Sequence, residues 1–447
     1  MSAVLLSLPT AALRERYGPR KYDHSPCAGL AAGDVCPAVL LPCALPNRAW
    51  NPADLGADGC RIDRLGPGFG FNPSIVRAPP ESLAELPPHL RNASYVAVDR
   101  FEANSNFRCP AGASVLNENV PSRSRGAFTQ SRLHLLDAEL RVLASAPVEG
   151  GRCVSGIFRV GDSRLHVIGS SIWATYVSMF SGCESPRMWL VRVALAFGVS
   201  DEPAAVRMNS FGVRRGVARL RAHFEATNVT GGFGLHGVTH DGTPRQAGEH
   251  RWSGNLTGPR NAGVLVGRSG APKYELTDIS PKLVIKDGRG GVFSDALAPR
   301  SFRGGGDHDP RAMHNSISPL WVEELGLYVG VAHRHYQAGS GSRTAQDPFR
   351  YGFSYRHVFF TMRERPNGIV SHSRELCFPT LDGDGEAACD GVQFVMGAFR
   401  PAAEAGAPIA FTYGVMDCES AVLTLSLDRL RALLEFTPHG NRSHHSL

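Results

Sequence analysis

Residues 314–335, HNSISPLWVEELGLYVGVAHRH, contain the pattern that decides the fold. A polar turn leads into a short apolar run, a loop with a glycine follows, and a second apolar run ends in polar residues. Two such runs separated by a short glycine-containing loop are typical of a β-hairpin. The segment therefore predicts two antiparallel strands with histidines at their polar ends.

The same plan recurs along the chain, in stretches that share pattern rather than identity. They lie at 71–102, 152–171, 259–279 and 389–420, and further strand-like runs lie between them at 131–145, 188–197, 281–287 and 356–362. Four strands per unit, opened by a hairpin, is the pattern of a β-propeller blade, and five units of roughly 75 residues predict five blades. The alternative is a sandwich of unrelated hairpins.

Composition agrees with an all-β class. The 447 residues are 43% hydrophobic, and the 49 glycines and 31 prolines are scattered, as many short strands joined by turns require. We predict an irregular N-terminal extension over 1–65, a five-bladed β-propeller over 66–434 and a disordered tail over 435–447.

Charge and cysteine patterns exclude several classes. The net charge is +6, but no basic run alternates with aromatic residues, so we expect no nucleic-acid partner. No run reaches 18 apolar residues, so we expect no integral membrane segment. The ten cysteines include no CxxC pair, so we expect no metal site, and nothing in the sequence indicates a cofactor.

The compartment stays open between cytoplasm and secretory lumen. Four N-glycosylation sequons begin at Asn92, Asn228, Asn255 and Asn441, which is compatible with secretion. The N-terminal run AVLLSLPTAAL is a weak signal-like segment without a basic start or a clear cleavage site.

In a propeller the innermost strands converge on a central channel, so polar residues at their ends become neighbours. The predicted funnel residues are Asn72, Asp99, Arg100 and Glu102, then Arg260 and Asn261, then His314, Asn315, His333 and His335, and finally Tyr413, Asp417 and Glu419. Carboxylates, imidazoles, amides and arginines together can bind sugar hydroxyls and an anion.

Each of these residues also has an ordinary structural interpretation. Asp417 and Glu419 point to one side of an extended chain and can share a ligand, or they cap a turn. Arg260 can form a fork for phosphate or an inter-strand ion pair. His333 and His335 with His314 can hold a metal, but hydrogen bonding to sugar or phosphate is the favoured role. Tyr413 is the aromatic residue expected to pack on a sugar ring.

These residues lie in motifs that resemble a known family. FNPSIV at 71, PRNAGVLV at 259, HNSISPLW at 314, YVGVAHRH at 328 and YGVMDCES at 413 resemble the five-bladed propellers that process β-mannosides. That family comprises β-mannoside phosphorylases and β-1,2-mannosyltransferases. The resemblance covers roughly residues 70–434 of this chain and leaves the N-terminal extension unexplained.

The resemblance implies an inverting displacement at the anomeric carbon, between a glycan and either a sugar phosphate or a sugar nucleotide. In the family an aspartic acid near the start of the second blade protonates the leaving oxygen. Here that region reads CVSGIFRVGDSRLHVIG from 153, and we expect its nearest acid, Asp162, in the hairpin loop. The acid step would then fall to Asp99, Asp309 or Asp417, or be lost.

The sequence therefore supports two main hypotheses. The first is a glycosyltransferase or glycoside phosphorylase, acting on a mannosyl unit, with Asp99 and Asp417 as the catalytic carboxylates. The second is a non-catalytic glycan-binding propeller that uses the same funnel. A structural or protein-interaction propeller that binds on its rim is a third and weaker alternative.

Overall fold

The structure is a computed structural model and consists mainly of β-strands. It describes residues 39–40, 43, 50–55, 58–66, 69–102, 129–149, 160–178, 187–199, 218–225, 261, 263–268, 270, 272–279, 282–287, 292–294, 313–337, 353–365, 368–378, 393–415 and 419–434. Within these residues helices are few and short: η1 (Pro80–Leu83), α2 (Pro88–Arg91) and α4 (Leu427–Leu434). The all-β class is confirmed.

The first sheet has eight strands and consists of two antiparallel sets of four. The strands of the first set are β3 (Phe71–Arg77), β4 (Tyr95–Glu102), β5 (Thr129–Leu136) and β6 (Val142–Glu149). Those of the second are β7 (Val160–Ile168), β8 (Ser171–Ser178), β9 (Arg187–Val199) and β10 (Ala218–Glu225). A parallel contact between β6 and β10 joins the two sets.

The remaining strands form three further sheets. One contains β11 (Gly263–Val266), β12 (Pro272–Asp278), β13 (Val284–Asp287) and β14 (Val292–Ser294). The next contains β15 (His314–Asn315), β16 (Leu320–Val322), β17 (Leu327–Gln337), β18 (Phe353–Arg363), β19 (Ile369–His372) and β20 (Leu376–Cys377). The last contains β21 (Gln393–Phe399), β22 (Ile409–Val415) and β23 (Glu419–Leu425).

Two strands come from the segment that we expected to be irregular. β1 (Val39–Leu40) pairs in parallel with β20, and β2 (Cys60–Arg64) pairs antiparallel with β23 at the other end of the chain. A disulfide between Cys43 and Cys60 ties this segment to β2, with a Cα–Cα distance of 5.1 Å. Partners about 360 residues apart leave no local signal, which is why sequence patterns did not predict this pairing.

Hydrophobic clusters lie between neighbouring sets of strands. One lies between β3–β6 and β7–β9, one between β11–β13 and β17–β18, one between β17–β18 and β21–β23, and one between β3–β5 and β21–β23. A smaller contact joins β7 and β8 to β11. Each set therefore buries both of its faces against other sets, as layered β architectures require.

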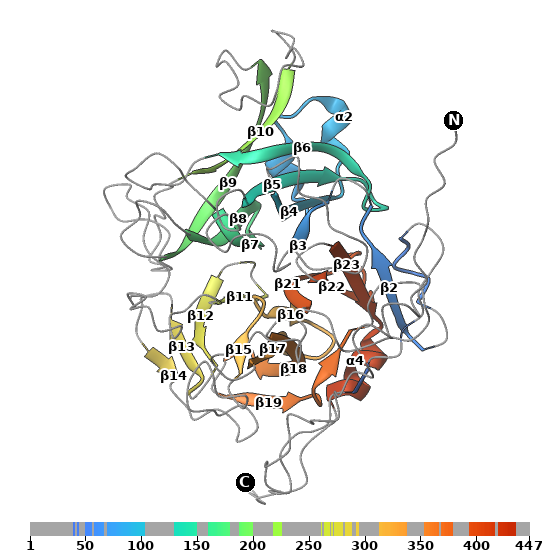
Figure 1. Cartoon of the computed structure of the whole chain (residues 1–447), viewed down its shortest axis with the longest axis vertical. Coiled ribbons are helices and arrows are strands. Elements are labelled where there is room, and N and C mark those ends of the chain that lie inside the picture. The colour runs from blue at the N-terminus through green and yellow to red at the C-terminus, as the bar shows by residue number, and fades with distance from the viewer. Residues whose placement is uncertain are drawn as a thin grey trace, which may run out of the picture.

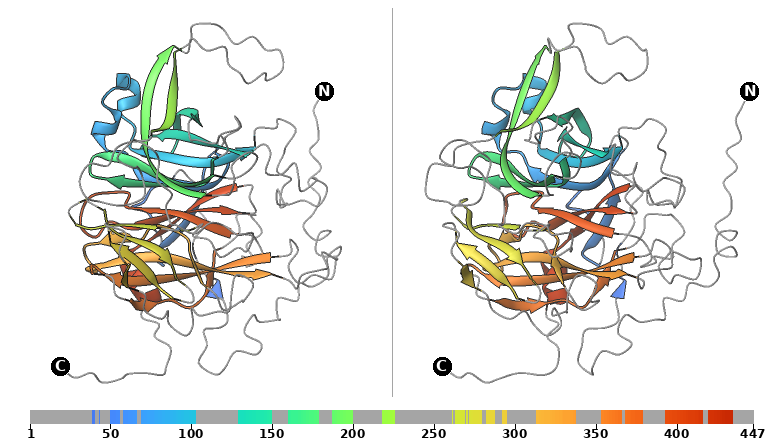
Figure 2. Two further views of the ribbon diagram at one scale, coloured as in Figure 1. Left: turned by 90° about the vertical axis from the view of Figure 1, so that its left-hand side faces the viewer. Right: turned by 60° about the vertical axis from the view of Figure 1, so that its left-hand side comes forward.

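A strand from the start of each set lies toward the middle of the molecule. β3, β7, β11, β16 and β21 surround the middle in Figure 1, and β3 contacts both β7 and β21. Seen from the side, the blue-to-green strands lie above, the red strands β21–β23 between, and the yellow and orange strands below (Figure 2). The inner strands thus bring their ends together, which positions the site described next.

Candidate functional site

Polar side chains gather where the inner strands begin. Asn72 lies at the start of β3, Asp162 at the start of β7, Asn261 just before β11, His314 and Asn315 in β15, and Gln393 at the start of β21. Hydrogen bonds join three of these parts of the chain into one network: β7, the residue before β11, and the segment around β15. The Gln393 side chain instead bonds to the Phe378 backbone.

The inner strand β3 contains a β-bulge. The register between β3 and β4 shifts between Phe71 and Ser74, and Asn72 has a φ of 51°. Asparagine tolerates this left-handed conformation better than most residues, and a bulge re-aims a side chain. Asn72 is buried against Gly414 of β22, where a Cβ on the glycine would lie 2.0 Å from the Asn72 Oδ1. The bulge in β3 is therefore closed, because Gly414 of β22 packs directly against Asn72.

A second bulge, in β7, carries Asp162. The register between β7 and β8 shifts between Gly161 and Arg164, and Asp162 has a φ of 49°. Its carboxylate accepts a hydrogen bond from Arg100 at 2.9 Å, and its side chain is 26% exposed. Asp162 therefore lies in the strand that begins the second set. Our expectation of a hairpin-loop position was wrong, because Asp162 is a bulge residue inside a strand that continues to Ile168.

Arg164, two residues further along β7, is a buried cation. Its Nε donates to the Ser316 carbonyl at 2.7 Å, and a terminal nitrogen donates to the Asn261 Oδ1 at 2.7 Å. Burial lowers the pKa of Arg164 to about 10, while nearby Asp162 acts in the opposite direction. The guanidinium thus stays charged at neutral pH and spans from β7 to two other strand sets.

The network continues from Asn261 into the strands around β17. The Asn315 Nδ2 donates to the Asn261 carbonyl at 2.6 Å, and the Ser316 hydroxyl lies 2.8 Å from the His333 Nδ1. Asn261, Asn315 and His333, all predicted site residues, are therefore linked through Arg164 and Ser316.

An aromatic group borders this network. The His333 ring centroid lies 5.6 Å from that of His314, 5.3 Å from Tyr355 and 5.0 Å from Phe394. Phe394, at the start of β21, also lies under the Arg164 guanidinium at 5.8 Å. Among the described residues no group of three or more potential ligands has the geometry of a metal site.

Asp99 lies beside this network and is fully buried. Its Oδ2 accepts hydrogen bonds from the Gly70 backbone, from Arg132 at 3.0 Å and from the His134 Nε2 at 2.9 Å. The Oδ1 atom is buried and has no hydrogen-bond partner among the described residues. A carboxylate enclosed in this way holds β3, β4 and β5 in register and is not open to a ligand.

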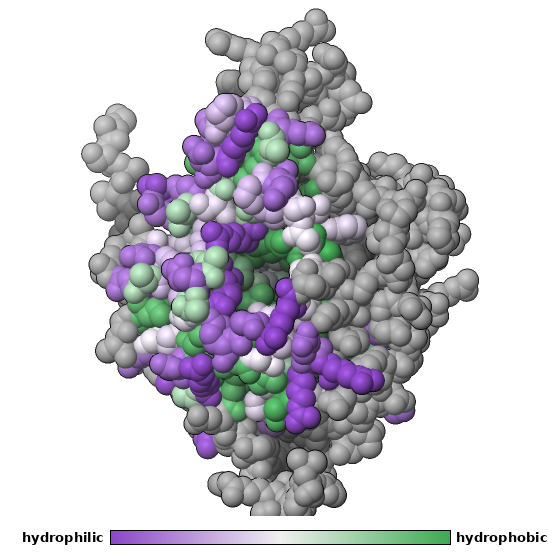
Figure 3. Space-filling model, turned by 180° about the vertical axis from the view of Figure 1, so that it is seen from behind, coloured by the Kyte–Doolittle hydropathy of each residue, from purple (hydrophilic) through white to green (hydrophobic). Residues whose placement is uncertain are grey.

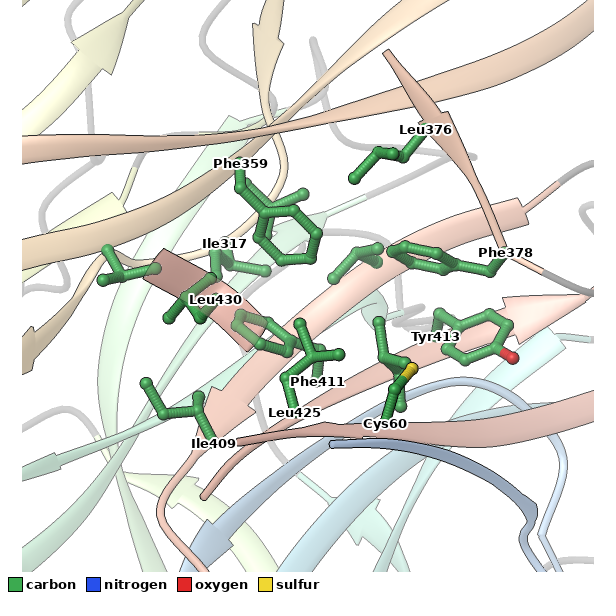
Figure 4. Packing of buried hydrophobic residues seen from close by; sticks show 14 of the residues in the cluster. Cys60, Ile317, Phe359, Leu376, Phe378, Ile409, Phe411, Tyr413, Leu425 and Leu430 are labelled. Carbon is green, nitrogen blue, oxygen red and sulfur yellow. The ribbon is translucent and has the colours of Figure 1, made fainter. Parts of the chain in front are cut away.

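The other predicted residues have different positions. Tyr413 is buried in a hydrophobic cluster, edge-on to Phe378 at 5.0 Å, so it lies in the core and presents no face to a sugar (Figure 4). Glu102, His335 and Glu419 lie in β4, β17 and β23, and their side-chain environments are outside the description. Arg260, Asp309 and Asp417 lie outside the described residues.

Sequence reasoning missed Arg164, Ser316 and Phe394 and misplaced Asp162. One signal was present: GDSRLH at 161 has the same offset from its strand as FNPSIV at 71, so Asp162 occupies the position of Asn72. The contacts of Arg164 had no such signal, because its partners Asn261 and Ser316 are about 100 and 150 residues away.

Seen from behind, the molecule is hollowed near the middle of its face, and both hydrophilic and hydrophobic residues border the hollow (Figure 3). Among the described helices, none is long and apolar enough to cross a membrane.

The fold and this network define an all-β protein with a charged, amide-rich and imidazole-bearing site at its inner strand ends. No family model matches the sequence, and neither does any curated protein.

Solved structures with a similar overall chain path include two phosphorylases and a sialidase. The β-1,2-mannobiose phosphorylase of Listeria innocua aligns over 86% of this chain and 96% of its own, at 12% identity and a TM-score of 0.44. MPT-4, a mannose phosphorylase of Leishmania mexicana, aligns over 94% of this chain and 96% of its own, at 11% identity and a TM-score of 0.39. The Trypanosoma rangeli sialidase aligns over 81% of this chain and 54% of its own, at 11% identity and a TM-score of 0.37. None of these likenesses specifies an activity for this chain.

Proposed function

We propose that the chain is a five-bladed β-propeller that acts on carbohydrate. Two observations support five blades: the strands fall into five sets, and the hydrophobic clusters link each set to two others, with the last set packed on the first. In a ring of blades every sheet face is covered in this way.

We further propose that the protein transfers a glycosyl unit, a mannosyl unit in the first instance, between a sugar phosphate or sugar nucleotide and a glycan, with inversion. The observation that carries this proposal is the pair Asp162–Arg100 beside buried Arg164. The partly exposed Asp162 carboxylate and the Arg100 guanidinium, with amides and imidazoles held nearby by Arg164, supply a proton-transfer group and an anion-binding group at one place.

In this proposal Asp162 exchanges the proton of the bridging oxygen. In the synthetic direction its carboxylate takes the proton from the acceptor hydroxyl, and in phosphorolysis the carboxylic acid returns it to the leaving oxygen. Asp417 remains a second candidate carboxylate.

The remaining site residues bind and orient the substrates. We assign phosphate binding to Arg100 and Arg260, and the orientation of sugar hydroxyls to Asn261, Asn315, His314 and His333, with His335 and Glu419 as further candidates. Arg164 positions Asn261 and the Ser316 backbone rather than touching substrate. Asp99 serves the same kind of positioning role, since its carboxylate is enclosed.

The alternative is a non-catalytic glycan-binding propeller. The observation that favours this alternative is the ion pair between Arg100 and Asp162, because it already engages one oxygen of the carboxylate. In that case the network recognises sugar hydroxyls and no bond is made or broken.

The test is incubation of the purified protein with mannose 1-phosphate or GDP-mannose and a panel of mannosyl and glucosyl acceptors. Product from the phosphate alone identifies a phosphorylase, and product from the nucleotide alone identifies a transferase. Glycan binding by calorimetry without product supports the alternative. The absence of both binding and product with every sugar contradicts the carbohydrate proposal.

A further inference from the structure

A second polar group lies away from the Arg164 network, across β4, β5 and β6. The His134 Nε2 lies 2.9 Å from the Asp99 Oδ2, and the His134 Nδ1 lies 2.7 Å from the Ser145 hydroxyl. Ser145 of β6 is directly opposite His134 of β5 in the antiparallel register. On the other side, His134 is opposite Ala97 of β4, and Asp99 lies two residues after Ala97. The three side chains therefore form one continuous chain of hydrogen bonds.

The network determines which nitrogen of His134 carries the proton. The Asp99 Oδ2 already accepts hydrogen bonds from the Gly70 backbone and Arg132, so this carboxylate acts as an acceptor. In the neutral imidazole, the Nε2 of His134 donates to this carboxylate and Nδ1 is left as a lone-pair acceptor. Ser145 consequently donates its hydroxyl proton to the basic nitrogen of an imidazole whose other side is held by a carboxylate.

Burial changes sharply along this chain of three residues. Asp99 and His134 are fully buried, and the Phe69 ring covers the imidazole at 4.7 Å, whereas Ser145 is exposed. The base and its orienting group are thus shielded from water, and Ser145 is the one exposed residue of the three.

We propose that Ser145 is a nucleophile toward small carboxylic esters, with His134 as general base and Asp99 as the residue that orients it. In the first step a bond forms between the Ser145 Oγ and the carbonyl carbon, and the hydroxyl proton passes to the His134 Nδ1. The ester C–O bond then breaks, and the alkoxide leaves with that proton. Water hydrolyses the acyl-serine by the reverse transfers and regenerates the hydroxyl.

The first test uses two probes, p-nitrophenyl acetate and a fluorophosphonate, on the full chain. We expect the fluorophosphonate to modify Ser145, identified by mass spectrometry, at least about 10²-fold faster than the exposed turn serine Ser170, because a positioned base contributes at least this factor. Ser145→Ala should abolish this labelling and the ester hydrolysis, and Ser170→Ala should change neither. Equal labelling of the two serines, or unchanged hydrolysis in Ser145→Ala, overturns the proposal.

A second measurement does not depend on the probes fitting the site. In Ser145→Cys the imidazole should promote thiolate formation, so iodoacetamide should alkylate that thiol about tenfold faster at pH 7 than the thiol of Ser170→Cys. His134→Gln in the Ser145→Cys background should remove the difference while leaving the exposed position accessible. Equal alkylation rates at the two positions overturn the assignment of His134 as a base.

Discussion

The strands β3 and β7 each contain a bulge with one residue in the left-handed region, Asn72 at φ 51° and Asp162 at φ 49°. The bulge around Asn72 is closed by Gly414. Two residues further along β3, the Ser74 hydroxyl accepts a hydrogen bond from the Leu165 backbone. Around Asp162 the bulge is partly open and faces Arg100.

The difference between the two bulges shows how one backbone feature serves two purposes. The β3 bulge carries neutral side chains and lets β3, β7 and β21 approach closely at the centre. The β7 bulge is followed by the buried titratable residues Arg164 and His166, and it holds a partly exposed carboxylate paired with Arg100. The closed bulge and the partly open bulge thus lie in neighbouring inner strands.

The largest effect is expected from Asp162→Asn. Asparagine keeps the size of the side chain and tolerates the left-handed φ, but it removes the proton-exchanging carboxylate. Turnover on whichever donor is used should fall by a factor on the order of 10²–10⁴ with little change in melting temperature. Asp428→Asn, in a fully solvated pair on α4, is the matched control. Normal turnover in Asp162→Asn would make the two bulges equivalent in function.

Gly414→Ala tests the closure of the β3 bulge. The new methyl group would lie 2.0 Å from the Asn72 Oδ1 and 2.8 Å from its backbone nitrogen, so backbone as well as side chain must move. We expect a loss of about 3 kcal/mol in the free energy of unfolding, at the upper end of overpacking costs. Denaturant unfolding of Gly368→Ala, where a methyl group meets nothing within 4 Å, provides the comparison. Equal stability of the two variants would show that the β3 bulge is not closed.

Arg164→Lys tests whether the guanidinium fork connects β7 to its neighbours. Lysine keeps the charge but cannot reach both the Ser316 carbonyl and the Asn261 Oδ1 with fixed geometry. We expect a loss of about 1–2 kcal/mol in the free energy of unfolding, the scale of one or two buried hydrogen bonds. Arg431→Lys on exposed α4 should cost much less. A loss no larger than that of the control would mean that the fork is dispensable.

The smallest expected effect is on the pH dependence of stability. His166 of β7 contributes to this dependence, and β3 contains no histidine. Burial, and secondarily Arg164, lower the pKa of His166 to about 3 from an ordinary value of 6.5. Below pH 6.5 the unfolded chain binds a proton that the folded chain does not, so stability falls as the pH drops from 6.5 toward 3. At pH 5.5 this amounts to about 1 kcal/mol.

His166→Gln keeps a partner for Thr175 and cannot titrate, so its stability should fall less steeply with acidification. For each protein, the free energy of unfolding is measured at pH 7.5 and at pH 5.5, and the two changes with pH are compared. This comparison removes the contribution of His357, which titrates in the same direction in both proteins. Identical slopes would contradict the pKa assigned to His166.

The sequence by itself determined the local features of this protein. Alternating apolar residues predicted most of the strands, the recurring hairpins predicted sets of four, and strand ends such as Asn261, His314 and Asn315 were identified because polar residues interrupt apolar runs there. These features depend on neighbours a few residues away, and periodicity reports such neighbours directly.

Only the tertiary structure decided which of these residues meet. It enclosed Asp99 between Arg132 and His134, moved Tyr413 into the core, brought Asp162 to Arg100, and paired β2 with β23 across the length of the chain. The physical reason is that a side chain's exposure and charge partners depend on strands tens to hundreds of residues away. A local pattern places a carboxylate at a strand end, but burial and pairing decide whether it supports the fold or faces a ligand.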